Sequence, residues 1–275
     1  MKRAFRIFVI VMSLMLSVLL SSCGVSVNVG SPKENSTASS SSSTSLTPSK
    51  ELTSQQSQEL LASKSFLPIG TIVVLKNSNQ KEMIVGVLQY EGNDKSKMYD
   101  YAAVLYPVGS TSSPDDYAFD KSQIQRVYYL GYWDSQEDDL QQRIKDALAK
   151  QSTSDEPSSS SSSASPAPSK ELTSQQSQEL LASKDFLPIG SIVVLKNSYQ
   201  KEMIIGVLQY YGNDKSKLYD YAAVLYPAGS ASSTEDYLFD KSQIQRVYHL
   251  GYWDSEEDNL QQTIKDTLAK QGTSN

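Results

Sequence analysis

The sequence repeats itself, and this feature limits the fold more than any other. Shifted by 120 positions, residues 49–151 overlay residues 169–271 almost letter for letter. Each copy, at about 100 residues, is long enough to bury a core of its own. Two copies are too few for a solenoid, in which stacked repeats complete one another. We therefore expect two tandem, independently folded copies of one small domain.

Serine-rich stretches lie on both sides of the first copy. They consist mostly of Ser, Thr, Pro and Ala, and such a composition buries too little apolar surface to offset the entropy of an ordered chain. We interpret them as linkers that act either as plain spacers or as glycosylated stalks. The predicted order is a signal segment (1–22), a linker (23–48), the first domain (49–151), a second linker (152–168), the second domain (169–271) and a short tail (272–275).

The N-terminus has the order of a secretory signal: Lys2, Arg3 and Arg6, an apolar run over 7–20, and small residues before Cys23, the single cysteine. The run Leu-Ser-Ser-Cys resembles the lipobox of bacterial lipoproteins, which implies cleavage before Cys23 and a diacylglyceryl group on its thiol. Two acyl chains make a stable membrane anchor, whereas one chain holds only marginally. The alternative is an ordinary secretory signal with an incidental cysteine. The lipobox predicts a protein anchored in the cell membrane on its extracytoplasmic side.

Apolar periodicity and turn residues place the elements of one copy. A helix is expected over 52–64, followed by five strands and a closing helix that begins at Asp134 or Ser135. The strands are predicted at 71–76, 82–90, 98–106, 117–119 and 124–129. The predicted fold class is α+β: a small antiparallel sheet or partly open β-barrel of about five strands with a C-terminal helix.

The second and third predicted strands are apolar on both of their alternating faces, so both faces must be covered. We expect a helix, or closure into a barrel, to supply the second cover. Gly86, in the middle of the second strand, marks a bend or a close approach. Leu140, Ile144 and Leu148 form one apolar face of the closing helix, which we expect to pack on the sheet.

Several short motifs occur in the same order in both copies. In the first copy they are Leu67-Pro68-Ile69-Gly70, Met83-Ile84 with Gly86, Tyr99-Asp100-Tyr101 running into Leu105-Tyr106-Pro107 with Gly109, and Gly131-Tyr132 before an acidic helix start. This order resembles an uncharacterised bacterial family, number 4176 among the domains of unknown function. The resemblance implies Gram-positive bacteria, proximity to type VII secretion systems and their LXG toxins, and a small non-catalytic accessory or chaperone-like role. The duplication and the anchor depart from the single cytoplasmic domains expected of that family, and what the resemblance still implies is a protein-binding module.

Residues for catalysis are scarce. The single histidine, His249, has Tyr129 at the equivalent place in the first copy, so a histidine-dependent reaction could run in one copy at most. The sequence contains no HExxH, CxxC or glycine-rich phosphate loop. Without the signal the chain carries 22 basic and 31 acidic residues, a formal charge of −9 that disfavours nucleic acid as a partner. We expect no enzyme activity, no cofactor and no bound metal.

Aromatic residues are the strongest binding candidates, because tyrosine and tryptophan combine a large rigid contact area with a polar tip. The alternative is that they fill the core of the sheet. Tyr199 and Tyr211 replace Asn79 and Glu91 of the first copy at hairpin and loop positions and are expected to be exposed. The predicted binding surface comprises Tyr99, Tyr101, Tyr106, Tyr132, Trp133, Tyr199, Tyr211, Tyr252 and Trp253.

These features predict a non-enzymatic, lipid-anchored surface protein whose two modules engage a protein partner at the cell envelope. A type VII secretion component or its toxin is the partner that the resemblance implies. Linked copies that reach one target would gain avidity, because the second contact is intramolecular. The alternative is a lipoprotein that binds cell-wall glycan through exposed aromatic side chains; a hydrolase ranks last. The sequence leaves the oligomeric state open.

Overall fold

The computed structural model describes residues 49–90, 97–110, 117–151, 167–211, 214–230 and 236–272. The predicted signal segment, Cys23 and the first linker lie outside these residues, as does most of the second linker. Within the described ranges, no helix has the length and apolar character needed to cross a membrane.

The two copies, repeat 1 and repeat 2, contain the same elements in the same order. Repeat 1 has α2 (Ser54–Ser63), β1 (Ile72–Leu75), β2 (Lys81–Tyr90), β3 (Met98–Leu105), β4 (Tyr117–Phe119), the 3-10 turn η1 (Lys121–Gln123), β5 (Ile124–Tyr129) and α3 (Ser135–Gln151). Repeat 2 has α4 (Ser174–Ser183), β6 (Ile192–Leu195), β7 (Lys201–Tyr211), β8 (Asp214–Leu225), β9 (Tyr237–Phe239), η2 (Lys241–Gln243), β10 (Ile244–His249) and α5 (Ser255–Gly272). The elements predicted for repeat 1 are confirmed, with ends that agree within two residues.

Each repeat forms an open antiparallel sheet of five strands. In repeat 1 the order is β4-β3-β2-β1-β5, so four strands follow one another and β5 returns to pair with β1. Repeat 2 has the equivalent order β10-β6-β7-β8-β9. The register between β2 and β3 shifts between Ile84 and Gly86, a bulge that bends the strand at the predicted place. The α+β prediction is therefore confirmed, with sheets that stay open.

The short first helix of each repeat begins at a capping box and lies against its own sheet. The Thr53 side chain accepts a hydrogen bond from the Gln56 N–H at 3.2 Å, and the Gln56 side chain accepts one from the Thr53 N–H at 3.0 Å. Ser57 then ties α2 to the sheet, because its Oγ accepts from the Val127 N–H at 2.8 Å. As a result α2 packs on β5, and α4 packs on β10 in the same way.

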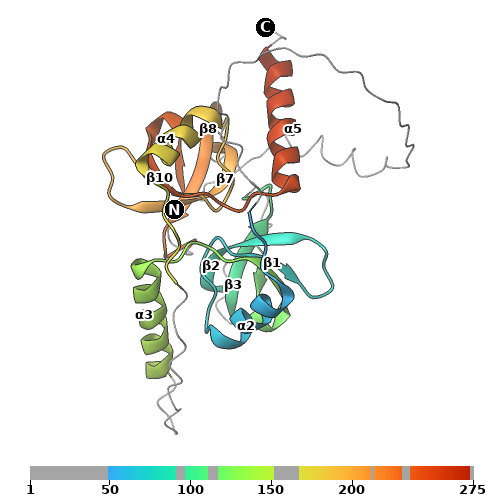
Figure 1. Cartoon of the computed structure of the whole chain (residues 1–275), viewed down its shortest axis with the longest axis vertical. Coiled ribbons are helices and arrows are strands. Elements are labelled where there is room, and N and C mark those ends of the chain that lie inside the picture. The colour runs from blue at the N-terminus through green and yellow to red at the C-terminus, as the bar shows by residue number, and fades with distance from the viewer. Residues whose placement is uncertain are drawn as a thin grey trace, which may run out of the picture.

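The closing helices contact the strands less than expected, although Leu260 and Ile264 of α5 are buried at 3% exposure. α3 and α5 leave the middle of the molecule in opposite directions (Figure 1) and make few contacts with any strand. Leu140, Ile144 and Leu148 of α3 are only partly buried. This face of α3 therefore lies at the margin of the core and not across the sheet, because contacts with repeat 2, described below, fix where the helix begins.

The two repeats are not independent domains on a tether. Buried apolar side chains of both repeats form one continuous cluster, and the two sheets meet in the middle of the molecule (Figure 1). Met83 on β2 illustrates the contact, since its Sδ lies 3.1 Å from where a Cβ on Gly190 would be. The other repeat thus covers part of the second apolar face of β2. The sequence instead predicts that a helix or closure into a barrel covers this face.

Candidate functional site

Motif residues of both repeats converge where the repeats meet, and this contact is the candidate functional site. After β3 the chain turns and lays Gly109 and Ser110 against β7 of repeat 2. Gly109 forms a β-bridge with Gly206, and the Ser110 N–H donates to the Ile205 carbonyl at 2.7 Å. The turn of repeat 1 is therefore joined to β7 of repeat 2 by an isolated β-bridge and a backbone hydrogen bond.

The same contact occurs with the repeats exchanged, and it requires glycine. Gly229 bridges Gly86, and the Ser230 N–H donates to the Val85 carbonyl at 2.7 Å. Gly229 has a φ of +74°, and a Cβ at this position would lie 2.4 Å from the Val85 carbonyl oxygen. A side chain here would be strained in its backbone and would push the two strands apart.

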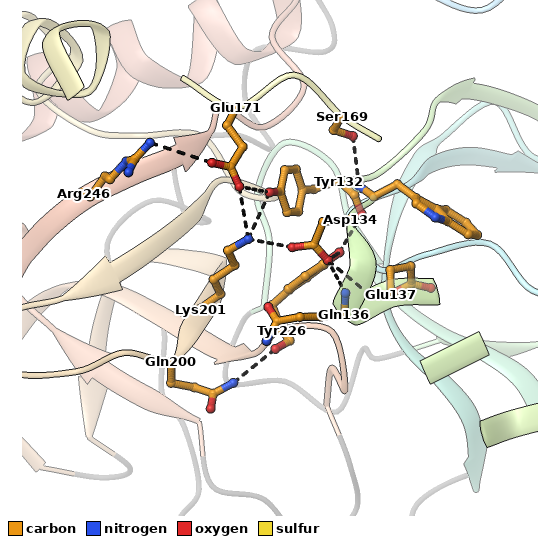
Figure 2. Close-up of polar contacts among 11 residues, drawn as sticks. Tyr132, Asp134, Gln136, Glu137, Ser169, Glu171, Gln200, Lys201, Tyr226 and Arg246 are labelled. Carbon is orange, nitrogen blue, oxygen red and sulfur yellow. Dashed lines mark hydrogen bonds and ion pairs between the residues drawn. The ribbon is translucent and has the colours of Figure 1, made fainter. Parts of the chain in front are cut away.

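A polar cluster beside this contact joins the start of α3 to repeat 2 (Figure 2). Lys201 Nζ lies 2.6 Å from Asp134 Oδ2, 3.0 Å from Tyr132 Oη and 3.3 Å from Glu171 Oε1. The Tyr226 Oη donates to Asp134 Oδ1 at 3.1 Å, and the same oxygen accepts from N–H groups in the first turn of α3. One carboxylate thus starts the helix and links the repeats.

Hydrogen bonding keeps both members of the central ion pair charged. Burial disfavours the charged forms of Lys201 and Asp134, yet their mutual hydrogen bond prevails, so the pKa of Lys201 is raised and that of Asp134 is lowered. Each side chain is 15% exposed. Charged hydrogen bonds in such a partly dry setting are directional and strong, and they fix how the two repeats are oriented.

An equivalent cluster occurs on the other side of the contact. Lys81 of repeat 1 pairs with Asp254 at the start of α5, and also with Glu256 Oε1 at 3.0 Å. The Tyr106 Oη donates to Asp254 Oδ1 at 3.0 Å. The lysine–aspartate pair, the tyrosine–aspartate bond and the tyrosine–glutamate bond of the first cluster recur 120 positions away, and Lys81 also contacts Glu256, which replaces Gln136.

The segments before the first helices also cross between repeats. The Ser169 N–H donates to the Trp133 carbonyl at 2.7 Å, and the Trp133 N–H donates to Ser169 Oγ at 2.9 Å. Ser49 makes the same two bonds with Trp253, at 2.8 and 2.9 Å. The N-terminal arm of each repeat, at Ser49 or Ser169, therefore binds the turn that precedes the closing helix of the other repeat.

At two positions a residue meets its own counterpart. A Cβ on Gly70 would lie 3.9 Å from the Gly190 Cα, and the reverse distance is the same. Tyr129 Oη and His249 Nε2 are 2.7 Å apart. Burial lowers the pKa of His249 to about 4, so the ring is neutral at pH 7. Its Nε2 can then accept a hydrogen bond from the Tyr129 hydroxyl. The single histidine thus takes part in pairing the repeats.

Four glutamates are buried near the two sheets and helix starts. Burial raises the pKa of Glu82, Glu202 and Glu137 to about 7 and that of Glu257 to about 8. One carboxyl oxygen of each, Oε2, lacks a hydrogen-bond partner among the described residues. These side chains are held as neutral acids below those pH values. Within the same ranges no three His, Cys, Asp or Glu side chains are grouped to hold a metal.

The structure places most of the predicted binding surface in the interior. Six of the nine aromatic residues are buried, namely Tyr101, Tyr106, Tyr132, Trp133, Tyr252 and Trp253. Their prediction as outward contacts is wrong, because their polar atoms bind within the molecule; the Tyr101 Oη, for example, accepts from the Leu67 N–H at 2.9 Å. Tyr99 is partly buried. Tyr199 and Tyr211 are exposed, at 103% and 59%, as expected.

Both repeats match the model of one known family. The model of the family described as a domain of unknown function, DUF4176, matches residues 66–140 and 186–260, which is more than half of the chain. No curated protein and no solved structure matches. The matched ranges contain Gly70, Gly86, Tyr106, Gly109 and Tyr132, the motif residues that join the repeats. The chain therefore belongs to the DUF4176 family and carries two tandem copies of its domain.

Proposed function

We propose that this protein is a non-enzymatic, lipid-anchored component of the cell envelope whose joined repeats bind a protein partner as one unit. The motif side chains are occupied in holding the repeats together, so contacts with a partner come from other residues. A type VII secretion component or its toxin is the class of partner proposed from the family setting, and the anchor proposed at Cys23 keeps the complex at the membrane.

The exposed aromatic residues of repeat 2 carry this proposal. Tyr199 lies in the turn before β7, and Tyr211 ends that strand; both are more than half exposed. Repeat 1 has Asn79 and Glu91 at these places. Exposed tyrosines act as anchors in protein interfaces, because they bury a large area at low entropic cost. The proposed contact is therefore one-sided and centred on repeat 2.

The chain supplies its own test variant. Tyr199→Asn with Tyr211→Glu gives repeat 2 the residues of repeat 1 and leaves the contact between the repeats intact. The immobilised protein is exposed to the secreted proteins of its host and, separately, to purified cell wall. We expect a secreted protein to be retained by the native chain and lost from the double variant, while Leu268→Ala, an exposed apolar change on α5, retains it. Retention of wall material alone would favour glycan binding and refute the proposal.

The anchor has a separate test. Cys23→Ser removes the thiol that would carry the diacylglyceryl group, so the variant should move from the detergent phase to the aqueous phase in a cloud-point extraction. The mass of the mature native protein should show two acyl chains on an N-terminal cysteine. Recovery of the native protein from the aqueous phase would contradict the lipoprotein assignment.

A further inference from the structure

The contact between the repeats is self-complementary. Lys81 binds Asp254 as Lys201 binds Asp134, and the bridge between Gly109 and Gly206 matches the bridge between Gly86 and Gly229. A contact in which residue i meets residue j, while j also meets i, is the isologous type that relates two identical subunits by a twofold axis. Gly70 facing Gly190 marks where that axis passes.

We propose that each repeat can pair through this same surface with a second copy of itself, so that the chain is a homodimer fused into one polypeptide. The groups that form the cross-contacts are the same residue type in both repeats at almost every position: the lysine, the two tyrosines, the aspartate, the serine of the arm and the two glycines. A surface built from one set of residues therefore already fits its own copy. The partner that this surface recognises is another repeat, whichever chain supplies it.

The connection between the repeats does not determine the pairing. Repeat 1 ends at Gln151, the last residue of the 17-residue helix α3, and Ser169 is bound to Trp133 just before that helix begins. The chain must therefore return by about 25 Å, the length of such a helix. Seventeen connecting residues can extend to about 56 Å, so the connection imposes no geometry. Its effect is to raise the local concentration of one repeat near the other.

Two contacts distinguish the pairing of unlike repeats from that of like repeats. The axis pair Tyr129–His249 would become two tyrosines in a pair of repeat 1 and two imidazoles in a pair of repeat 2. Lys81 also binds Glu256 at 3.0 Å, whereas repeat 1 has Gln136 at the position equivalent to Glu256. Two tyrosine hydroxyls can form one hydrogen bond across the axis, and so can two neutral imidazoles. All three pairings of the repeats are therefore compatible with the contact.

The test starts from the folded full chain. A protease site is placed within residues 152–166, and the purified protein is cut after folding. Cut protein labelled with heavy isotopes is mixed with unlabelled cut protein, and native mass spectrometry follows the halves. We expect the halves to remain in pairs and, on incubation, to redistribute into pairs of repeat 1, mixed pairs and pairs of repeat 2. Uncut protein treated in parallel should show no redistribution.

A substitution in one repeat makes the outcome specific to this surface. Gly109→Ala places a Cβ 2.4 Å from a backbone oxygen of the other repeat at a φ of +80°. A mixed pair contains this substitution once and a pair of repeat 1 contains it twice, whereas a pair of repeat 2 does not contain it. If one substitution weakens pairing about tenfold, two weaken it about a hundredfold. Halves that separate, lose their fold on cutting, form only mixed pairs, or respond equally in all three pairings would overturn the proposal.

Discussion

Replacing Lys201 by methionine removes the ion pair at the centre of the first polar cluster and keeps the length of the side chain. The variant loses three charge-assisted contacts, to Asp134 at 2.6 Å, Tyr132 at 3.0 Å and Glu171 at 3.3 Å. It also loses the ammonium placed 4.9 and 4.8 Å from the ring centres of Tyr132 and Tyr248. The contacts with Asp134 and Tyr132 lie between the repeats, whereas Glu171 and Tyr248 belong to repeat 2 itself.

The expected cost follows from what Asp134 keeps. Removing one partner of a buried pair costs about 3–5 kcal/mol when the other charge is left alone. Asp134 still accepts from the Tyr226 hydroxyl and from the first turn of α3, and its side chain remains 15% exposed. We therefore expect Lys201→Met to lower the unfolding free energy by about 2–4 kcal/mol, which is less than the cost of leaving a buried charge with no partner. Urea unfolding of the full chain, followed by circular dichroism, measures the change in unfolding free energy.

Lys217 offers a matched control in the same repeat. Its Nζ lies 2.9 Å from Asp240 Oδ2, but the two side chains are 52% and 32% exposed. Lys217→Met should therefore change the unfolding free energy little, because solvent screens an exposed ion pair. In addition, Lys201→Met should weaken the pairing of halves after the linker is cut, and Lys217→Met should not. A cost for Lys201→Met within about 0.5 kcal/mol of the control would refute the view that the cluster holds the repeats together.

The buried glutamates and the buried histidine make the stability depend on pH. Because burial raises the pKa of Glu82 and Glu202 to about 7 from an ordinary 4.5, the folded state holds protons that the unfolded state releases, and their contribution falls as pH rises from about 4.5 to 7. Glu82→Gln should flatten the decline in unfolding free energy measured between pH 5 and pH 8; an unchanged slope would contradict this. Burial lowers the pKa of His249 to about 4, so its contribution is full above about 6.5 and is lost as pH falls toward 4. His249→Tyr, which copies Tyr129, should make the stability less sensitive to acid, and a variant as acid-sensitive as the native chain would be evidence against a neutral buried imidazole.

The elements of each repeat could be predicted because their signals are local. Thr53 and Gln56 form a capping box over four residues, and the β strands are runs of apolar residues bounded by turns. Gly86 predicted a bend within a strand, and the register shift confirms it. Such signals depend on neighbours in sequence, so one chain without relatives is enough to read them.

The pairing of the repeats was not predicted, because its residues look like core residues. Tyr106 and Tyr132 have the same sequence signature whether they fill the core of one repeat or lie in the contact between the two repeats, which we call the seam. The signal that pointed to the seam was the apolar second face of β2, which needed a cover that one repeat does not supply. A second signal was the equivalence of Tyr129 and His249, which acquires meaning only once the two are known to touch. Sequence spacing within one copy carries no information about a partner 120 residues away.

The fused arrangement frees the molecule from obligate symmetry. When two identical chains associate, any mutation appears in both of them, so a new binding patch on one subunit is repeated on the other by the twofold axis and can promote polymerisation. Here each half is encoded separately, so that repeat 2 has Tyr199 and Tyr211 at the sequence positions where repeat 1 has Asn79 and Glu91. One flank can therefore diverge toward a ligand while the other stays hydrophilic and the shared seam remains untouched.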